Sequence, residues 1–468
     1  MADAWRTEID SLGSVDVPAE AYYGAQTARA LANFQLSGLR VPRRLICALA
    51  LVKAAAARAN VSLGLLDARL GEAIERAALE VSGGGLGDAF VLDVFQTGSG
   101  TSTNMNANEV IANRAAEILG GRRGDKSLVH PNDHVNMGQS TNDVFPTAIH
   151  VAALLALEQD LVPALRALAD SLDRKATEFA DVVKAARTHL QDAVPITLGQ
   201  EFSGYASVVR HGIARIEQSR THLQELALGG TAAGTGLNAH PDFAASAIAE
   251  LSRLTGQDLR RADNAFEAMQ NRDAAVELSG ACRTIAVGLM KMANDLRLLS
   301  SGPLTGLAEI SLPELQPGSS IMPGKINPVI PEAVTMVAAQ VIGYDAAIAI
   351  AALNGNLDLN TMMPIIAYDL LESVDLLANA SRALAERCVD GIRADRERCR
   401  SYAERSPQVA TALAPIIGYD AAAALVKRAL NEGLSIREAL RASKLVSEEH
   451  LDETVDLLAL TRGGRARG

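Results

Sequence analysis

The stretch LLALEQDLVPALRALADSL, residues 154–172, carries a continuous apolar stripe along one side of a helix. Its leucines recur at steps of three and four residues, at Leu154, Leu157, Leu161, Leu165, Leu168 and Leu172. This spacing predicts one long helix with a buried face. Pro163 lies inside the stretch and should bend the helix locally, because proline has no N–H to donate.

Two further segments show stripes of the same kind. Residues 283–300 place apolar side chains at helical spacing, at Ile285, Leu289, Met292, Leu296 and Leu299. Another long helix is expected over residues 331–352. Stripes this long bury more surface than one neighbouring helix can cover, so we expect a bundle of long helices that also forms an oligomer.

Composition narrows the class of protein. Of 468 residues, 48% are apolar and 3% aromatic, so the core must consist of Ala, Leu, Val and Ile. The net charge of −11 argues against nucleic-acid binding, which needs a basic face. Apolar stretches such as residues 337–353 contain Gln340 and Asp345 and are expected to be too short to cross a membrane. With no signal-peptide pattern in MADAWRTEID, we expect a soluble, cytoplasmic protein.

Changes in pattern along the chain predict three domains. Residues 1–139 are mixed but mostly helical, with helical spacing over residues 45–80 and 104–119 and a glycine-rich loop near residue 85. Residues 140–364 form the central domain of long helices. Helices are expected to shorten after residue 364, so residues 365–468 form a small helical C-terminal domain.

Four polar, glycine-containing segments lie where helices begin or end, and together they are candidates for a functional site. They are TGSGTSTNMN (97–106), HPNDHVNMGQSTND (130–143), RTHLQDAVPITLGQE (187–201) and GSSIMPGKIN (318–327). Ser, Thr and Asn are preferred helix N-caps, so each segment alone has an ordinary structural explanation. A helix N-terminus also binds anions, and two of the segments add a histidine or a lysine.

Metal and cofactor chemistry has weak support in the residues. The four cysteines, Cys47, Cys282, Cys388 and Cys399, have no metal-binding spacing, so reduced thiols are expected. His130 and His134 are four residues apart without a third ligand, which makes a poor zinc site. No P-loop, dinucleotide fingerprint or serine-hydrolase elbow is visible.

Five blocks of the chain together resemble the fumarase/aspartase superfamily. They are TGSGTSTNMNANEVIANRA, HPNDHVNMGQSTNDVFPTAIHVA, RTHLQDAVPITLGQEFSGY, LALGGTAAGTGLN and GSSIMPGKINP, in this order. The similarity begins near residue 7 and covers nearly the whole chain. LALGGTA, with Gly230, is most similar to the class II fumarate hydratases.

The resemblance implies a mainly α, three-domain fold with a central bundle of long helices. It implies a homotetramer, in which the bundles join into a core of about twenty helices and three subunits build each active site. The implied substrate is a small dicarboxylate, fumarate or malate. Neither a metal nor an organic cofactor is implied, nor a nucleic-acid or membrane partner.

The resemblance also implies roles for individual residues. Ser319 would be the base that acts on carbon, and His189, paired with Glu332, would handle the proton of water. The residues that would bind substrate are Ser99, Gly100, Thr101, Ser140, Thr141, Asn142, Thr188, Ser320, Lys325, Ile326 and Asn327. A secondary dicarboxylate site would comprise His130, Pro131, Asn132 and Asp133; there, Ser127 replaces an arginine of some relatives, so weak binding is expected.

The mechanism needs strong electrostatic help, because the carbon acid beside a carboxylate is very weak. The dianionic intermediate requires positioned donors and a cation, for which Lys325 and Asn327 are suited. Two alternatives stay open. An aspartate ammonia-lyase has the same fold and more often carries STND, the sequence at 140–143. A non-catalytic helical scaffold would have the same bundle, but such proteins usually lose the loop that this chain retains.

Overall fold

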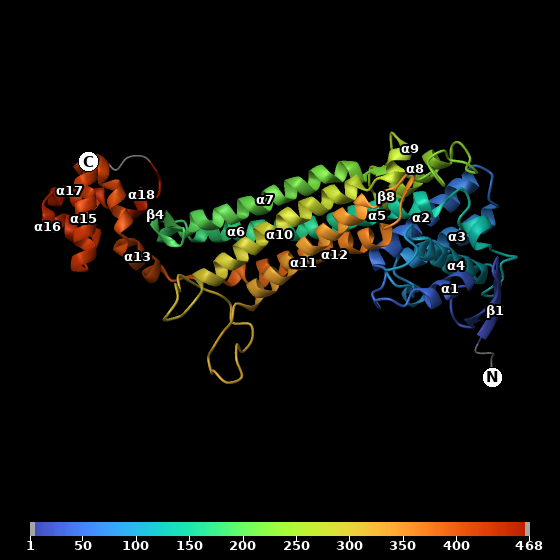
Figure 1. Ribbon diagram of the computed structural model, residues 1–468, viewed down its shortest axis with the longest axis horizontal. Coiled ribbons are helices and arrows are strands. Elements are labelled where there is room, and N and C mark those ends of the chain that lie inside the picture. Colours follow the sequence, from blue (N-terminus) through green and yellow to red (C-terminus); the bar gives the residue numbers. More distant parts are fainter. Residues whose placement is uncertain (1–4, 464–468) are drawn as a thin grey trace. The chain divides into compact units, whose positions relative to one another are not determined.

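The computed structural model describes residues 5–463 and is mainly helical (Figure 1). It divides into two compact units. Unit 1 contains the residues up to Pro163 together with Ala214–Ala286 and Ala339–Ala378. Unit 2 contains Ala164–Ile213, Val287–Ala338 and the residues from Asn379 onward.

Unit 1 is built around an alanine-rich helix, α2. Figure 1 shows α2, α3 and α4 side by side, and their small side chains form one buried cluster that includes Ala54, Ala77 and Ile111. Small residues let the helix axes approach closely. The other elements contained in unit 1 are shorter. The bounds are β1 Trp5–Asp10, β2 Gly13–Pro18, α1 Ala25–Asn33, α2 Arg43–Ser62, α3 Ala68–Ser82, α4 Thr101–Ile118, α5 Thr141–Ala156, β5 Glu225–Leu226, α8 Phe243–Thr255, β6 Arg260–Arg261, α9 Ala265–Gln270, β8 Gly355–Asn356 and β9 Leu359–Asn360.

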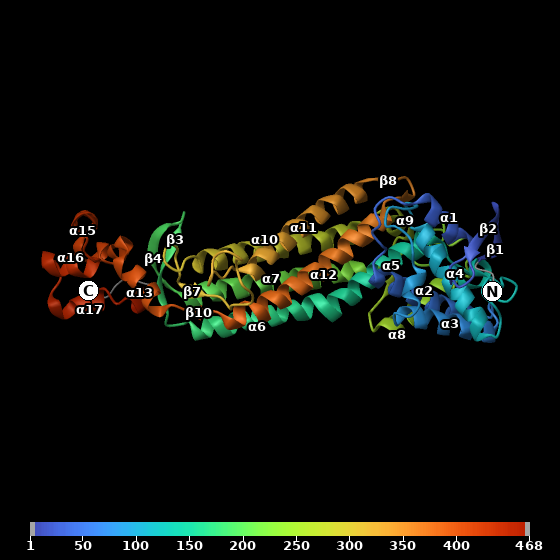
Figure 2. The same ribbon diagram turned by 90° about the horizontal axis from the view of Figure 1, so that it is seen from below.

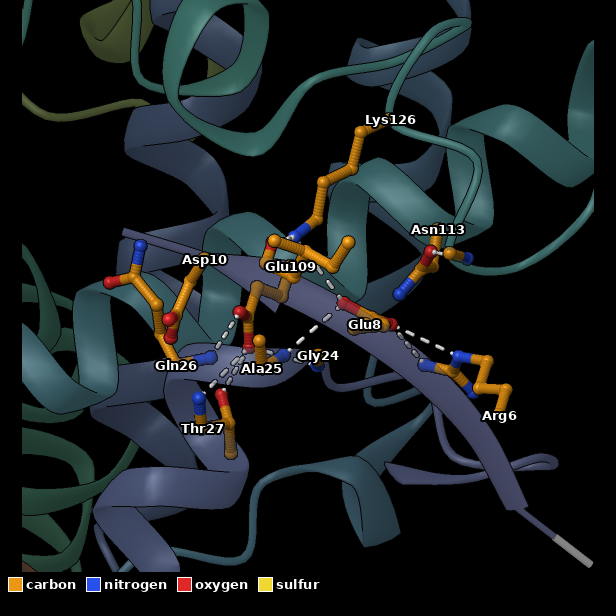
Figure 3. Close-up of polar contacts among 12 residues, drawn as sticks. Arg6, Glu8, Asp10, Gly24, Ala25, Gln26, Thr27, Glu109, Asn113 and Lys126 are labelled. Carbon is orange, nitrogen blue, oxygen red and sulfur yellow. Dashed lines mark hydrogen bonds and ion pairs between the residues drawn. The ribbon is translucent and has the colours of Figure 1, made fainter. Parts of the chain in front are cut away.

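A buried carboxylate attaches α1 to α4. Glu109, on α4, accepts hydrogen bonds from the N–H groups of Gly24, Gln26 and Thr27 at 2.8, 2.8 and 3.1 Å. Figure 3 shows Glu109 directed at the start of α1, with Glu8 from β1 beside it. The free N–H groups of a helix N-terminus favour such an anion, so this contact fixes the chain ahead of α1.

The long stripes form long helices, as the sequence predicts. The long helices are α6 Val162–Glu178, α7 Leu198–Leu223, α10 Asp273–Leu299, α11 Val329–Leu353 and α12 Met363–Arg387. The disturbance expected at Pro163 takes the form of a π-helical turn over Leu157–Leu161. The N–H of Val162 bonds to the carbonyl of Leu157, five residues earlier. A widened turn of this kind accommodates a proline that has no N–H for the regular pattern.

One expectation about helix length was wrong. Helices shorten after Arg387 and not after residue 364, because α12 has 25 residues and continues to Arg387. The helices that follow have 14 residues or fewer, as expected. The stripe of α12 stays buried, with Leu370, Val374 and Leu377 each 0% exposed. The division into three domains stays a prediction.

Unit 2 contains the short helices of the C-terminal segment and two small sheets. Apolar side chains from α15, α16 and the turn before them form a cluster that includes Leu413, Leu425 and Leu440. Figure 2 shows the antiparallel hairpin β3–β4 beside α13. The bounds are β3 Val183–Thr188, β4 Gln191–Thr197, β7 Ile310–Ser311, β10 Arg393–Ala394, α13 Arg396–Arg405, α14 Ala414–Ile417, α15 Tyr419–Glu432, α16 Ile436–Ser443, α17 Glu448–Thr454 and α18 Leu457–Leu460.

Three helical stretches are long and apolar enough, by length and composition, to cross a membrane. They are Arg43–Ser62, Thr141–Glu178 and Val329–Leu353. The expectation that the most apolar stretch is too short was therefore wrong, because α11 begins eight residues before Val337 and has 25 residues. In the most apolar part of each stretch, 78% and 67% of the residues are buried for the first two, but only 28% for α11. Most of the apolar surface of α11 is thus uncovered in a single chain.

Candidate active site

The first polar segment forms the start of α4 and is shaped by two close contacts. A Cβ on Gly100 would lie 2.3 Å from the Phe145 ring, and one on Gly98 would lie 1.8 Å from the carbonyl oxygen of Thr361. Only glycine fits at these positions. Ser99 Oγ and Thr101 Oγ1 are 2.8 Å apart. The predicted residues Ser99, Gly100 and Thr101 therefore share one tight turn at a helix N-terminus.

The second segment forms the start of α5, next to α4. Ser140 is the N-cap and makes a capping box with Asp143. Asn142 Nδ2 donates to the carbonyl oxygen of Ala232 at 2.8 Å. Thr141 Oγ1 accepts a hydrogen bond from Asn104 Nδ2, one turn into α4, at 2.9 Å. The starts of α4 and α5 therefore lie against each other, joined by the hydrogen bond from Asn104 to Thr141 and by the close approach of Gly100 to Phe145. Each helix N-terminus has free N–H groups that favour an anion.

A buried polar network beneath these helix starts is missing from the sequence predictions. Asp143 is 0% exposed and accepts hydrogen bonds from the N–H groups of Ser140, Gly229 and Thr231 at 3.0, 3.0 and 2.9 Å. Burial raises the pKa of Asp143 to about 6, although these donors and Lys53 act to lower it. Lys53 is also 0% exposed. Burial lowers the pKa of Lys53 to about 7, opposed by the charge of Asp143.

Residues 130–133, the predicted secondary site, form a tight turn in unit 1. His130 Nδ1 accepts hydrogen bonds from the N–H groups of Asn132 and Asp133 at 3.3 and 3.1 Å, and Pro131 begins a π-helical turn, Pro131–Val135. Pro131 is buried, whereas Asn132 and Asp133 are exposed.

The third segment is a β-hairpin, which the sequence analysis did not foresee. Thr188 pairs with Gln191, and His189 and Leu190 form the two-residue turn with φ of 57° and 60°. A two-residue turn with both φ values positive is the favoured hairpin geometry, but it usually needs Asn or Gly. Thr188, His189 and Leu190 are exposed. An exposed histidine with a positive φ, a conformation that usually needs Asn or Gly, is a candidate functional residue.

Buried charges hold this hairpin. Glu309 is 0% exposed and lies 3.1 Å from Lys184 and 3.0 Å from Arg187, both on β3. Lys184, which is 2% exposed, also pairs with Glu201 at 2.6 Å. Removing one member of such a buried group leaves an uncompensated charge, so the hairpin that carries His189 is firmly anchored.

The fourth segment is a loop closed on itself ahead of α11. The N–H of Gly318 donates to the carbonyl oxygen of Lys325 at 2.8 Å, and Asn327 Nδ2 donates to the carbonyl oxygen of Gly318 at 2.8 Å. Ser319 Oγ accepts hydrogen bonds from the N–H groups of Ile321 and Met322, each at 3.2 Å. The Ser319 hydroxyl thus has two backbone donors.

The side chains of the remaining predicted residues of unit 2 have no hydrogen-bond or ion-pair partner within residues 5–463. Ser320, Lys325 and Ile326 are exposed, and Lys325 makes no ion pair within residues 5–463. Glu332 lies in the first turn of α11. No hydrogen bond or ion pair joins Glu332 to His189 in the described chain, so their pairing stays a prediction. The first two polar segments, from Ser99 to Asn142, belong to unit 1. The hairpin with His189 and the loop ahead of α11 belong to unit 2.

The buried polar network around Lys53 and Asp143 could have been anticipated in part from the spacing of polar residues in the sequence. Lys53 interrupts the apolar run ALALVKAAAA, and Asn104 and Asn108 are one turn apart on α4. A charged residue on a buried helix face needs a polar partner, which predicts a network without naming its members. The partners Asn136 and Gln139 lie in the loop ahead of α5, whose path the sequence does not reveal.

The described side chains offer anion binding rather than metal binding. No group of three His, Cys, Asp or Glu residues in the described chain has the proximity needed for a metal ion. All four cysteines are free thiols. Unit 1 supplies N–H groups and hydroxyls at two helix starts, and unit 2 separately supplies His189 and Lys325. Groups of both kinds suit the binding of a carboxylate.

Comparisons with known proteins agree with this chemistry. A family described as "Lyase" matches residues 13–343, and one described as "Fumarase C C-terminus" matches residues 409–462. The chain is 53% identical to a class II fumarate hydratase of Nitrosomonas europaea, covering 98% of this chain and 99% of the relative. It is 55% identical to that of Halobacterium salinarum, covering 100% and 99%.

Solved structures show the same fold. A recombinant class II fumarase from Schistosoma mansoni superposes with a TM-score of 0.94 at 40% identity, covering 98% of this chain and 99% of that one. A structure from Brucella melitensis, described as fumarate lyase:delta crystallin bound to cobalt, also has a TM-score of 0.94, at 51% identity and the same coverage.

Proposed function

We propose that Ser319, His189 and Glu332 catalyse the reaction of this chain. The chain belongs to the lyase family that includes the class II fumarate hydratases. It is a hydro-lyase that hydrates fumarate to malate. The relatives from Nitrosomonas europaea, Halobacterium salinarum and Schistosoma mansoni are class II fumarate hydratases, so the ammonia-lyase alternative has no support beyond Thr141. The scaffold alternative has none.

The observation that carries the proposal is the environment of Ser319. Its Oγ accepts two backbone N–H groups, from Ile321 and Met322. A free serine hydroxyl is so weakly acidic that almost none of it ionises, and only the ionised form, the alkoxide, is basic enough to remove a proton from carbon. Donors aimed at the oxygen stabilise the alkoxide, and Lys325 on the same loop adds positive charge. The loop therefore favours Ser319 as the base that takes the C3 proton of malate and returns it in the hydration direction.

The charge that develops on the substrate needs its own donors. We assign Lys325 and Asn327, with Ser320 and Ile326 beside them, to the carboxylate next to the reacting carbon, where the aci-carboxylate forms. The helix starts at Ser99–Thr101 and Ser140–Asn142, together with Thr188, bind the substrate carboxylates. Fixed donors of this kind do not need to reorganise when the charge appears.

His189 handles the proton of the water that adds at the other carbon. Histidine titrates near neutral pH, which suits it to take and return a proton. Glu332 would hold the ring in one tautomer and stabilise its charged form. His189 lies in an exposed hairpin turn and Glu332 is half-buried on α11. The two residues do not pair within one described chain, so His189 of one copy would pair with Glu332 of another.

The uncovered surface of α11 supports a homotetramer with shared active sites. Large apolar side chains on this helix are exposed, including Met336 at 67%, Ile350 at 60% and Leu353 at 83%. Burial of such a face stabilises association by the hydrophobic effect. Covering it with copies of the same helix yields the long-helix core expected from the sequence, and we propose that the assembled enzyme is a cytoplasmic protein. The turn at residues 130–133 is proposed as a weak secondary dicarboxylate site.

The test is the Ser319→Ala variant, with Ser311→Ala as its control. Ser311 is an exposed serine on β7. Loss of the base is expected to reduce kcat for malate dehydration at least about 100-fold, in the range typical of general base catalysis. The control should keep the parent rate. Incorporation of deuterium at C3 of malate in D2O should fall in parallel; exchange at the parent rate in Ser319→Ala would refute the assignment of the base.

A further inference from the structure

One ammonium group is completely buried beneath the start of α5. Lys53 lies on α2, and its Nζ donates to Asn136 Oδ1 at 2.8 Å and to Gln139 Oε1 at 2.9 Å. Both partners are neutral amides. Burial of an ammonium group whose hydrogen-bond partners are both neutral is unfavourable compared with an apolar side chain of similar size, and the nearby charge of Asp143 offsets this cost only in part. The charge at this position therefore calls for a role that an apolar side chain cannot supply.

The ammonium group determines how the neighbouring amides are oriented. Lysine can only donate, so Asn136 must present its Oδ1 to Lys53. The same oxygen also accepts hydrogen bonds from Asn104 Nδ2 at 3.3 Å and from Asn108 Nδ2 at 3.2 Å. Asn104 Nδ2 donates in addition to Thr141 Oγ1 at 2.9 Å. A continuous set of hydrogen bonds thus leads from the buried charge to the start of α5.

Two unpaired acceptors indicate that this orientation is imposed. Asn104 Oδ1 and Asn108 Oδ1 are buried and have no hydrogen-bond partner in the described part of the chain. Buried amide oxygens are nearly always paired in folded proteins. Here both amides turn their Nδ2 groups toward Asn136, and their oxygens are left unpaired as a result.

The orientation has a direct consequence at Thr141. Its Oγ1 accepts from Asn104, so the hydroxyl hydrogen is available for another acceptor, and no acceptor within residues 5–463 takes it. If Asn104 turned over, Thr141 would donate inward to the amide oxygen instead. We propose that Lys53 is a positioning residue, which holds the Thr141 hydroxyl as a donor to a substrate carboxylate by orienting the two asparagines between them. This inference rests on the proposed binding role of Thr141.

The experiment compares Lys53→Met, Thr141→Val and the double variant. Methionine matches the length of lysine but carries no charge and no donor. KM for fumarate, and the inhibition constant of succinate as an unreactive dicarboxylate, are each expected to rise about 10-fold in both single variants, as for one lost hydrogen bond to a charged group. kcat should fall much less. In the double variant the rise should equal that of Thr141→Val alone, because Lys53 acts through that hydroxyl.

Lys175→Met serves as the matched control for the loss of a buried lysine. Lys175 is 8% exposed and pairs with Glu178, remote in sequence from the network. Its loss should lower Tm and leave KM unchanged, whether or not Thr141 is replaced. Should Lys53→Met not fold, Asn104→Asp presents only oxygen acceptors to Thr141 Oγ1, so the hydroxyl would donate inward; the same rise in KM and the same lack of additivity are expected.

The outcomes separate this inference from the proposal it rests on. If Thr141→Val raises KM but Lys53→Met does not, or if the two effects multiply in the double variant, Lys53 does not position Thr141, and the binding role of Thr141 stands. If Thr141→Val leaves KM and the succinate constant unchanged, both the binding role and the inference are wrong. Neither result affects the test of Ser319.

Discussion

Replacing Asp93 with asparagine is expected to release the loop that leads into the first site segment. Asp93 is 2% exposed, and its carboxylate accepts four hydrogen bonds. Oδ2 accepts from the N–H groups of Ser37 and Gly38 at 2.7 and 2.9 Å, and Oδ1 accepts from the Ser37 hydroxyl and the N–H of Phe95 at 2.8 and 2.9 Å. In asparagine, one of these oxygens becomes an NH2 group, which faces two donors.

The magnitude follows from the protonation equilibrium of the same group. Burial raises the pKa of Asp93, but the donors at Ser37, Phe95 and Gly38 outweigh it and bring the pKa from 3.8 to about 2. At about 1.36 kcal/mol per pH unit, this lowering of the pKa means that the ionised carboxylate stabilises the loop by about 2 kcal/mol. The folded pKa is lowered, so this contribution is present above pH 3.8 and is lost as the pH falls toward 2.

Hydrogen exchange measures this effect locally, which avoids treating a large protein as a two-state folder. At pH 7, the amides of Ser37, Gly38 and Phe95 are expected to exchange about 30-fold faster in Asp93→Asn, the factor that corresponds to about 2 kcal/mol. Asp67→Asn is the matched control. Asp67 is an exposed N-cap of α3 that accepts from Arg69 and Leu70 at 3.0 and 3.1 Å.

Asparagine is as good an N-cap as aspartate, so exchange at the start of α3 should change little in the control. Unchanged exchange of the Ser37, Gly38 and Phe95 amides in Asp93→Asn would refute the reasoning, since it would mean that the charge on Asp93 contributes nothing to the loop. An equal acceleration in Asp67→Asn would refute it as well, because the effect would then not depend on burial.

Two further predictions concern buried groups in unit 1. Gly24→Ala is expected to lower the free energy of unfolding by about 2 kcal/mol, as for other overpacked sites, because its Cβ would lie 2.7 Å from Glu8 Oε2 and 2.9 Å from Glu109 Cδ; an unchanged Tm would contradict this. Burial raises the pKa of the Cys282 thiol to about 12, so iodoacetamide at pH 8 should leave Cys282 unmodified in the folded protein. Labelling of Cys282 as fast as of half-buried Cys47, followed by mass spectrometry, would show that the thiol is accessible.

Local patterns in the sequence predicted the helices and the segments where the chemistry lies. A leucine stripe such as Leu161 to Leu172 has one stable solution, a helix with that face buried. Hydroxyl and amide residues at a break in such a pattern predict a helix start with free N–H groups, as found at Thr101 and Thr141. The sequence does not predict the continuation of α12 to Arg387, because the charged residues of the C-terminal part indicate short helices there.

What the sequence by itself determined is therefore the set of long helices and the polar segments at their ends, because both depend on residues within a few turns of one another. Only the tertiary structure decided which of these segments meet, and that the charge of Lys53 lies beneath Thr141 although the two are far apart in the chain. The hairpin turn at His189 belongs to the same category. The strand that leads into it is attached by ion pairs of Lys184 and Arg187 with Glu309, and such contacts between distant residues leave no periodic trace in a sequence.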